Sequence, residues 1–118
     1  MMEGYQGLKF PNSHQRVSIG AGQSLIVWEF LIPAGGAAFV ESVAIIIPDS
    51  NTYYKWRMDG DDVEEGTIDY QIGKINEPKM FNPPLVAKKK IQFIGYNDSS
   101  SDQTFEVLCD GLYYVRHI

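Results

Sequence analysis

The chain has 118 residues, of which 44% are hydrophobic, and this size suits a single domain that buries its own core. Its formal charge is −5 at pH 7, so it lacks the basic surface with which nucleic-acid-binding proteins replace phosphate counterions. Cys109 is the only cysteine, so no intrachain disulfide can form. We therefore expect a one-domain protein of a reducing compartment that does not bind nucleic acid.

The first residues carry neither the basic start nor the apolar run of a signal peptide. The apolar stretches elsewhere are broken within about ten residues, which is too short to cross a bilayer. We expect the protein to be made in a cytoplasm, without a secretion signal and without a membrane partner.

Residues 1–13 are interrupted by glycine, proline and asparagine, and we expect an irregular segment there, followed by one domain over residues 14–118. Tyr5, Leu8 and Phe10 are apolar side chains of this segment without obvious partners near them in the sequence. The segment is either a frayed terminus or an arm that docks on a partner, and the sequence leaves both open.

The first three expected strands cover residues 15–19, 24–32 and 39–47 and are separated by turns that contain glycine and proline. The second and third are apolar on both faces. Such a pattern favours a strand in the middle of a sheet, or one that is covered on its outer side.

Residues 52–58 alternate cleanly, with Tyr54 and Trp56 on one face, and Tyr53 with charged side chains on the other. This period of two is typical of a half-buried strand. We interpret Tyr54 and Trp56 as core rather than as part of a sugar-stacking platform. Because turns divide residues 23–60 into three consecutive strands, we expect an antiparallel meander.

The same alternation predicts a strand over residues 67–72. Three prolines then exclude a central strand from residues 73–90, and leave room only for a short edge strand near 80–81 or 85–86. A further strand is expected over residues 91–96.

The end of the chain carries the sequence pattern of a hairpin. Asp110-Gly111 lies between the strand-like segments 104–109 and 112–117, and Asp-Gly accommodates the positive φ angles of a two-residue type I′ turn. In this hairpin, Cys109 is expected to be a small buried core residue rather than a reactive thiol.

No window shows a sustained period of 3.6 residues, so essentially no helix is expected. About eight short strands with glycine and proline turns between them are typical of an all-β protein. The predicted fold is an antiparallel two-sheet β-sandwich, jelly-roll-like in topology.

Residues 59–65 contain clustered carboxylates, and carboxylate oxygens are ligands that Ca²⁺ prefers. The candidate calcium ligands are Asp59, Asp61, Asp62, Glu64 and Glu65. The competing interpretation is a solvated turn after a strand, because the spacing differs from that of an EF-hand loop. No other cofactor is expected.

Signals of catalysis are weak throughout the chain. No serine stands in a Gly-x-Ser-x-Gly elbow, and neither His14 nor His117 has metal ligands at suitable spacing. We therefore expect a protein that is not an enzyme. The basic run Lys88-Lys89-Lys90 is either a solvated strand entrance or a contact for a phosphate or an anionic surface.

Four segments follow one another in the chain: SLIVWEFLIPAGGAAFVESVAIII, YYKWRMDG, IQFIGYNDSS and FEVLCDGLYYV. Pro33-Ala34-Gly35 follows one expected strand and Asp59-Gly60 follows another. In this turn chemistry the chain resembles small β-sandwich virion proteins of tailed bacteriophages, which include capsid decoration or cement proteins and head or tail accessory modules.

The resemblance implies a structural protein of the virion that forms a homo-oligomer and binds neighbouring virion proteins. Apolar burial and strand-edge pairing would provide the contacts. The implied interface residues are Tyr5, Leu8, Phe10, Leu25, Val27 and Leu31. The alternative function is a carbohydrate-binding module or receptor-binding lectin-like domain, with exposed aromatic side chains and a surface glycan as its partner.

Overall fold

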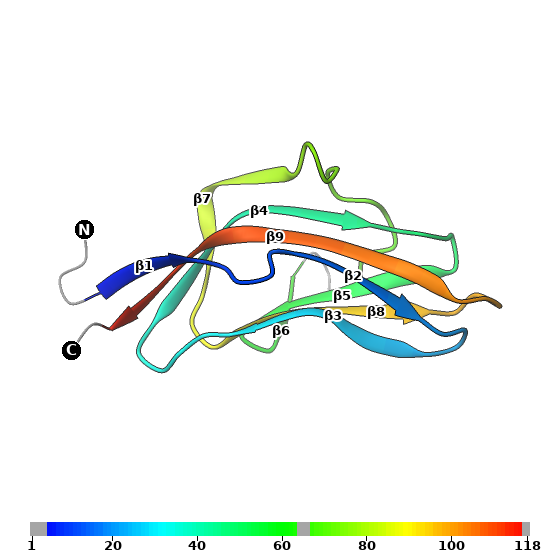
Figure 1. Cartoon of the computed structure of the whole chain (residues 1–118), viewed down its shortest axis with the longest axis horizontal. Coiled ribbons are helices and arrows are strands. Elements are labelled where there is room, and N and C mark those ends of the chain that lie inside the picture. Colours follow the sequence, from blue (N-terminus) through cyan, green and yellow to red (C-terminus); the bar gives the residue numbers. More distant parts are fainter. Residues whose placement is uncertain (1–4, 64–66, 117–118) are drawn as a thin grey trace.

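The computed structural model describes residues 5–63 and 67–116, which form nine β-strands and no helix (Figure 1). The strands make two antiparallel sheets that pack face to face as a sandwich. The prediction of an all-β, two-sheet protein is confirmed. In these two ranges there is accordingly no helix that is long and apolar enough to cross a membrane.

The first sheet has β9 as its central strand. Its five strands are β1 (Tyr5–Lys9), β2 (His14–Ile19), β4 (Ala37–Ile46), β7 (Lys79–Ala87) and β9 (Gln103–Arg116). The order is β1-β9-β4-β7, and β2 shares one side of β9 with β1. β4 pairs along the other side of β9, so one long strand connects nearly the whole sheet.

The second sheet is built around β8. Its four strands are β3 (Ser24–Leu31), β5 (Thr52–Met58), β6 (Asp61–Asp62) and β8 (Lys90–Asn97). They follow the order β3-β8-β5-β6, which places β3 at one edge. Both β3 and β5 therefore pair with β8 and not with each other.

The expected meander over residues 23–60 is wrong, because its consecutive strands alternate between the sheets. β3 and β5 lie in the second sheet, whereas β4 lies in the first, between β9 and β7. Turn signals fix where strands end but not which sheet the next strand joins. The two strand orders establish a sandwich, and the jelly-roll-like topology stays a prediction.

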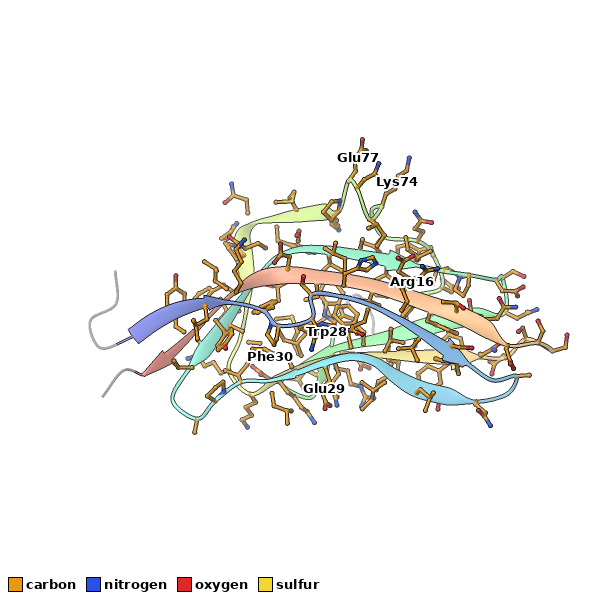
Figure 2. The ribbon with its side chains drawn as sticks, in the orientation of Figure 1. Arg16, Trp28, Glu29, Phe30, Lys74 and Glu77 are labelled. Atoms are coloured by element: carbon orange, nitrogen blue, oxygen red, sulfur yellow. The ribbon has the colours of Figure 1, made fainter. Side chains whose placement is uncertain are left out.

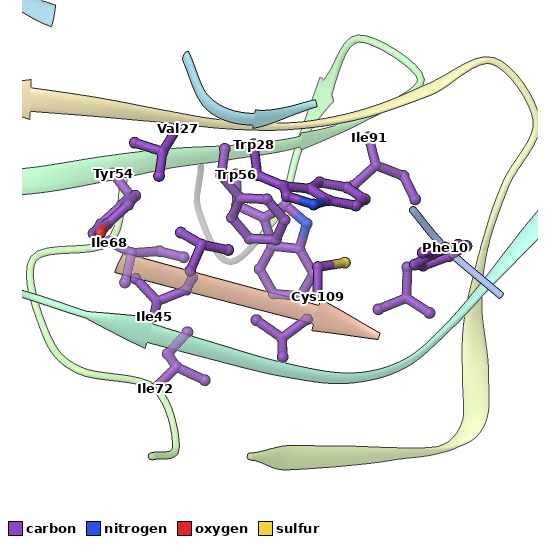
Figure 3. Close-up of a cluster of buried hydrophobic side chains, with 14 of the residues drawn as sticks. Phe10, Val27, Trp28, Ile45, Tyr54, Trp56, Ile68, Ile72, Ile91 and Cys109 are labelled. Carbon is purple, nitrogen blue, oxygen red and sulfur yellow. The ribbon is translucent and has the colours of Figure 1, made fainter. Parts of the chain in front are cut away.

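The core lies between the sheets, and its centre is aromatic (Figure 3). Trp56 stacks on Phe93 with ring centroids 5.2 Å apart, and Tyr54 meets Phe105 edge-on at 5.3 Å. The buried Tyr54 hydroxyl donates to the backbone carbonyl of Ile46 at 3.0 Å. The interpretation of Tyr54 and Trp56 as core is confirmed, since both are fully buried.

The expectation of an irregular segment over residues 1–13 is wrong for Tyr5–Lys9, which form β1, whereas residues 10–13 lie outside any strand. β1 pairs with the C-terminal end of β9, for example Leu8 with Tyr113. Phe10 is only 5% exposed, and its ring packs 5.4 Å from that of Phe30. Partners distant in sequence stabilise this segment, which is why local patterns did not reveal it. Residues 1–4 lie outside the described ranges.

The predicted closing hairpin is also wrong, because residues 103–116 form the single strand β9. Gly111 does not adopt a positive φ angle, which a type I′ turn requires. It lies in the ladder opposite Val40, and Asp110 lies opposite Ser42. Cys109 is paired with Val43 and is buried, as expected.

Two later segments have mixed outcomes. Residues 67–72 are not a strand, and make isolated bridges through Ile68 and Ile72 to β5 and β4. The predicted edge strand is confirmed as β7, at the end of the first sheet. Pro83 and Pro84 lie between Met80 and Leu85, in the part of β7 where its pairing with β4 is interrupted.

Candidate functional site

The most exposed apolar surface among the predicted interface residues lies on β3. Of these residues, Leu25 is 48% exposed and Leu31 is 64% exposed, and their neighbour Ile26, which was not predicted as an interface residue, is also 48% exposed. β3 is an edge strand, so the expectation of a central position for it is wrong, and the alternative of a strand covered on its outer side stays a prediction. An edge strand leaves backbone N–H and C=O groups on its outer side, where another strand can pair.

A β-bulge decides which side chains of β3 face outward. The register with β8 shifts between Ile26 and Trp28, and Val27 is only 4% exposed. Val27 is therefore core, and its prediction as an interface residue is wrong. Figure 2 shows Trp28 and Phe30 directed between the sheets and Glu29 directed away from them. A bulge inserts one residue and thereby changes the alternation, which simple parity cannot detect.

The opposite edge of the sandwich, β7, carries several features that discourage pairing. It contains Pro83 and Pro84, which have no N–H to donate, and it begins with Lys79. β3 has neither proline nor lysine along its eight residues, and Glu29 is its only charged side chain. The β3 edge is therefore open to strand addition in a way that the β7 edge is not.

The two predicted interface residues of the N-terminal segment whose side chains are described, Leu8 and Phe10, do not form an exposed surface. Phe10 belongs to the core, where it packs against Trp28 at 5.9 Å between ring centroids, so its interface role is corrected. Leu8 is half-buried and paired with Tyr113. The Tyr5 side chain lies outside the described parts of the structure.

The predicted calcium ligands that the structure describes, Asp59, Asp61 and Asp62, are not grouped around one point. The Asp59 carboxylate accepts hydrogen bonds from the backbone N–H groups of Lys88, Lys89 and Lys90 at 2.6–3.1 Å. Burial alone would raise the pKa of Asp59, but these N–H donors and the charge of Lys89 outweigh it and lower the pKa. Asp59 thus secures the turn between β7 and β8.

The other candidate calcium ligands are paired, exposed or not described. Arg57 donates to Asp62 at 2.8 Å, and Asp61 is exposed. Glu64 and Glu65 lie outside the described residues. Within the residues that are described, no three His, Cys, Asp or Glu side chains are grouped so that they could hold a metal ion.

Chemically reactive side chains are few in the described structure. His14 meets Glu106 at 2.5 Å on the outer surface of the first sheet, with Arg16 at 3.9 Å from the same carboxylate. Burial, with a smaller contribution from the charge of Asp110, raises the pKa of the Cys109 thiol. A buried thiol that resists ionisation is a poor nucleophile.

One aromatic pair lies on the outer face of the second sheet. Tyr53 and Tyr96 are cross-strand neighbours whose rings are stacked at 4.8 Å, with an interplanar angle of 5°. The amino group of Lys55 lies 5.7 Å from the centre of the Tyr96 ring. The sequence missed this pair because its two members lie on different strands, 43 positions apart.

A hollow of about 550 Å³ opens where the β3–β4 turn meets the β7–β8 turn. Its lining residues are Gly35, Gly36, Ala37, Phe39, Val86, Lys88 and Lys89. Two lysines of the basic run thus border a mostly apolar surface. Nothing in the local sequence signals this juxtaposition, because Gly36 and Lys88 are 52 positions apart in the chain.

None of the known protein families has a model that matches the chain, and no curated protein matches its sequence.

Proposed function

We propose that the chain is a structural subunit of a bacteriophage virion, which is not an enzyme and which acts by self-association and by binding neighbouring capsid or tail subunits. The observation that carries this proposal is the open β3 edge with its exposed Leu25, Ile26 and Leu31. The turn chemistry shared with small virion sandwiches supports the viral setting.

The β3 edge suits assembly for two physical reasons. An added strand would satisfy backbone groups along β3, and the contact would be repeated by every copy. The same contact would cover the apolar side chains of β3, and apolar area removed from water contributes roughly 25 cal/mol per Å². We therefore assign the interface to the β3 edge and not to the N-terminal segment.

The mass of the full chain in solution, measured by light scattering on a sizing column, tests self-association. We expect a homo-oligomer that Leu31→Lys dissociates, because a lysine on an edge strand discourages pairing. Met80→Lys is the matched control, since Met80 is 67% exposed on the β7 edge. A monomeric wild-type chain, or equal dissociation by both variants, would contradict the assignment.

The viral setting requires a separate measurement. Phage particles purified on a density gradient should contain the chain, which mass spectrometry of their proteins detects. Its absence from such particles, together with a stable oligomer, would retain the assembly surface and reject the virion.

The stacked Tyr53 and Tyr96 favour a second candidate function, a carbohydrate-binding or receptor-binding domain. Aromatic rings at a surface are suited to packing against a sugar ring, although one face of each ring is already occupied by the other. A glycan array separates the two functions, because a structural subunit is expected to bind none of the sugars.

A further inference from the structure

The hollow between the two turns combines an apolar floor with cationic side chains. Phe39 and Val86 are cross-strand neighbours on β4 and β7, and Val86 is 51% exposed. The Phe39 ring meets Tyr114 edge-on at 5.5 Å, which supports it from the side of β9. Lys88 and Lys89 follow directly on Val86 and Ala87 in the chain and are both exposed.

The glycine turn keeps one wall of the hollow free of side chains. A Cβ atom on Gly36 would lie 2.4 Å from the backbone oxygen of Tyr114, so only glycine fits there. Gly35 has a φ angle of 81°, and a Cβ atom added to it would meet nothing within 4 Å. The open space beside Gly35 is thus a consequence of the turn that leads into β4.

The turn that carries the lysines is held from two sides. Asp59 accepts hydrogen bonds from the backbone N–H groups of Lys88, Lys89 and Lys90. The backbone N–H of Ile32 donates to the carbonyl of Lys89 at 2.9 Å. Because the backbone is fixed in this way, ordering two lysine side chains on a ligand costs less than it would on a free loop.

The charge of these lysines is available to a ligand. The charge of Lys89 also acts on Asp59, whose pKa it helps to lower, but neither lysine belongs to an ion pair within the described residues, and the chain as a whole has a formal charge of −5. An anionic group would find its charge complement here, beside a surface that accepts an apolar body.

We propose that the hollow binds a small organic acid, with its apolar body on Phe39 and Val86 and its carboxylate at the amino groups of Lys88 and Lys89. The volume of about 550 Å³ lies within the range of small-molecule sites. This site is separate from the β3 edge, so it stands or falls independently of the proposed function.

The probe for this site is octanoate, titrated into the full chain while backbone amide signals are followed by NMR. We expect saturable shifts at Gly35, Gly36 and Val86. Octanol, which has the same chain length without the charge, should bind at least about tenfold more weakly, because it forms no charge-assisted contact with the lysines. Equal binding of the two probes, or no saturation at these amides, would overturn the proposal.

Matched variants then locate the site. Lys88→Gln/Lys89→Gln should weaken octanoate binding about tenfold. Lys55→Gln/Lys74→Gln, which removes two lysines from other surfaces, should leave binding unchanged. Val86→Asp should abolish binding, whereas Met80→Asp on the same strand should not. If Lys55→Gln/Lys74→Gln loses as much affinity as Lys88→Gln/Lys89→Gln, and Met80→Asp as much as Val86→Asp, octanoate does not bind in the hollow.

Discussion

The chain contains the dipeptide Asp-Gly at residues 59–60 and again at residues 110–111, and the two copies have opposite structures. Asp59 and Gly60 have φ angles of 58° and 87° and turn the chain between β5 and β6. Asp110 and Gly111 lie inside the continuous strand β9. The same two residues thus make a tight turn at one place and extended backbone at another.

The difference lies in what surrounds each dipeptide. A Cβ atom on Gly60 would meet nothing within 4 Å, so Gly60 serves the positive φ angle of the turn. A Cβ atom on Gly111 would lie 2.1 Å from the backbone oxygen of Phe39 and 3.0 Å from the Phe10 ring. Gly111 therefore serves close packing of β9 between β4 and Phe10. Local propensity permits a turn at both sites, and tertiary contacts decide which one forms.

The largest expected effect comes from Gly111→Ala. The added methyl group must displace the backbone of β4, so we expect the free energy of unfolding to fall by about 3 kcal/mol. Gly60→Ala should lower it by only about 1 kcal/mol, through strain in the left-handed region. Urea denaturation of both variants measures the two values.

The relative size of the two losses in free energy of unfolding tests the explanation given for each glycine. If Gly60→Ala costs as much as Gly111→Ala, close packing of β9 does not explain the glycine at position 111. If Gly111→Ala leaves the free energy of unfolding unchanged, the backbone of β4 can shift to accommodate the methyl group despite its pairing with β9.

A smaller effect is expected from Asp59→Asn. Asparagine keeps the shape and tolerates a positive φ angle, but it removes the charge that Lys88, Lys89 and Lys90 contact through their N–H groups. We expect a loss of about 1 to 2 kcal/mol in the free energy of unfolding at pH 7. The free energy of unfolding of this variant and of the wild type, from urea denaturation at pH 7, gives the value.

The pH dependence of this loss follows from the lowered pKa of Asp59. A carboxylate whose pKa is lower in the folded chain than in the unfolded chain stabilises the fold above the unfolded value, near 3.8. Its contribution disappears as the pH falls through the folded pKa. The difference between wild type and Asp59→Asn should be constant above about pH 5 and shrink below about pH 4. A difference that stays the same at pH 3 would contradict the role of the charge.

The sequence predicted those parts of the fold where local pattern and tertiary structure agree. Tyr54 and Trp56 alternate with polar residues on a strand that is half-buried, so the period of two identified the core face correctly. Prolines 83 and 84 cannot join the middle of a ladder, so the edge position of β7 was also predictable.

Other parts depend on partners that are distant in the sequence. β1 is a strand because β9 lies beside it, and the Asp-Gly at residues 110–111 stays extended for the same reason. The prediction of interface residues is limited in the same way, because the exposure of a side chain also depends on tertiary structure. Of the interface residues predicted on β3, Leu25 and Leu31 are exposed, whereas Val27 is turned inward by a bulge that the alternation of apolar and polar residues does not reveal.

The smallest effect is expected from Asp110→Asn, the isosteric counterpart of Asp59→Asn. The Asp110 Oδ1 atom accepts a hydrogen bond from the N–H of Gly111 at 2.9 Å, and an asparagine oxygen can accept the same bond. Asp59 accepts hydrogen bonds from three backbone N–H groups, whereas only this one is described for Asp110. We therefore expect the free energy of unfolding to change by less than about 0.5 kcal/mol, and urea denaturation at pH 7 checks it. A loss as large as that of Asp59→Asn would mean that the charge at position 110 also supports β9, and the two Asp-Gly sites would then differ in their glycines alone.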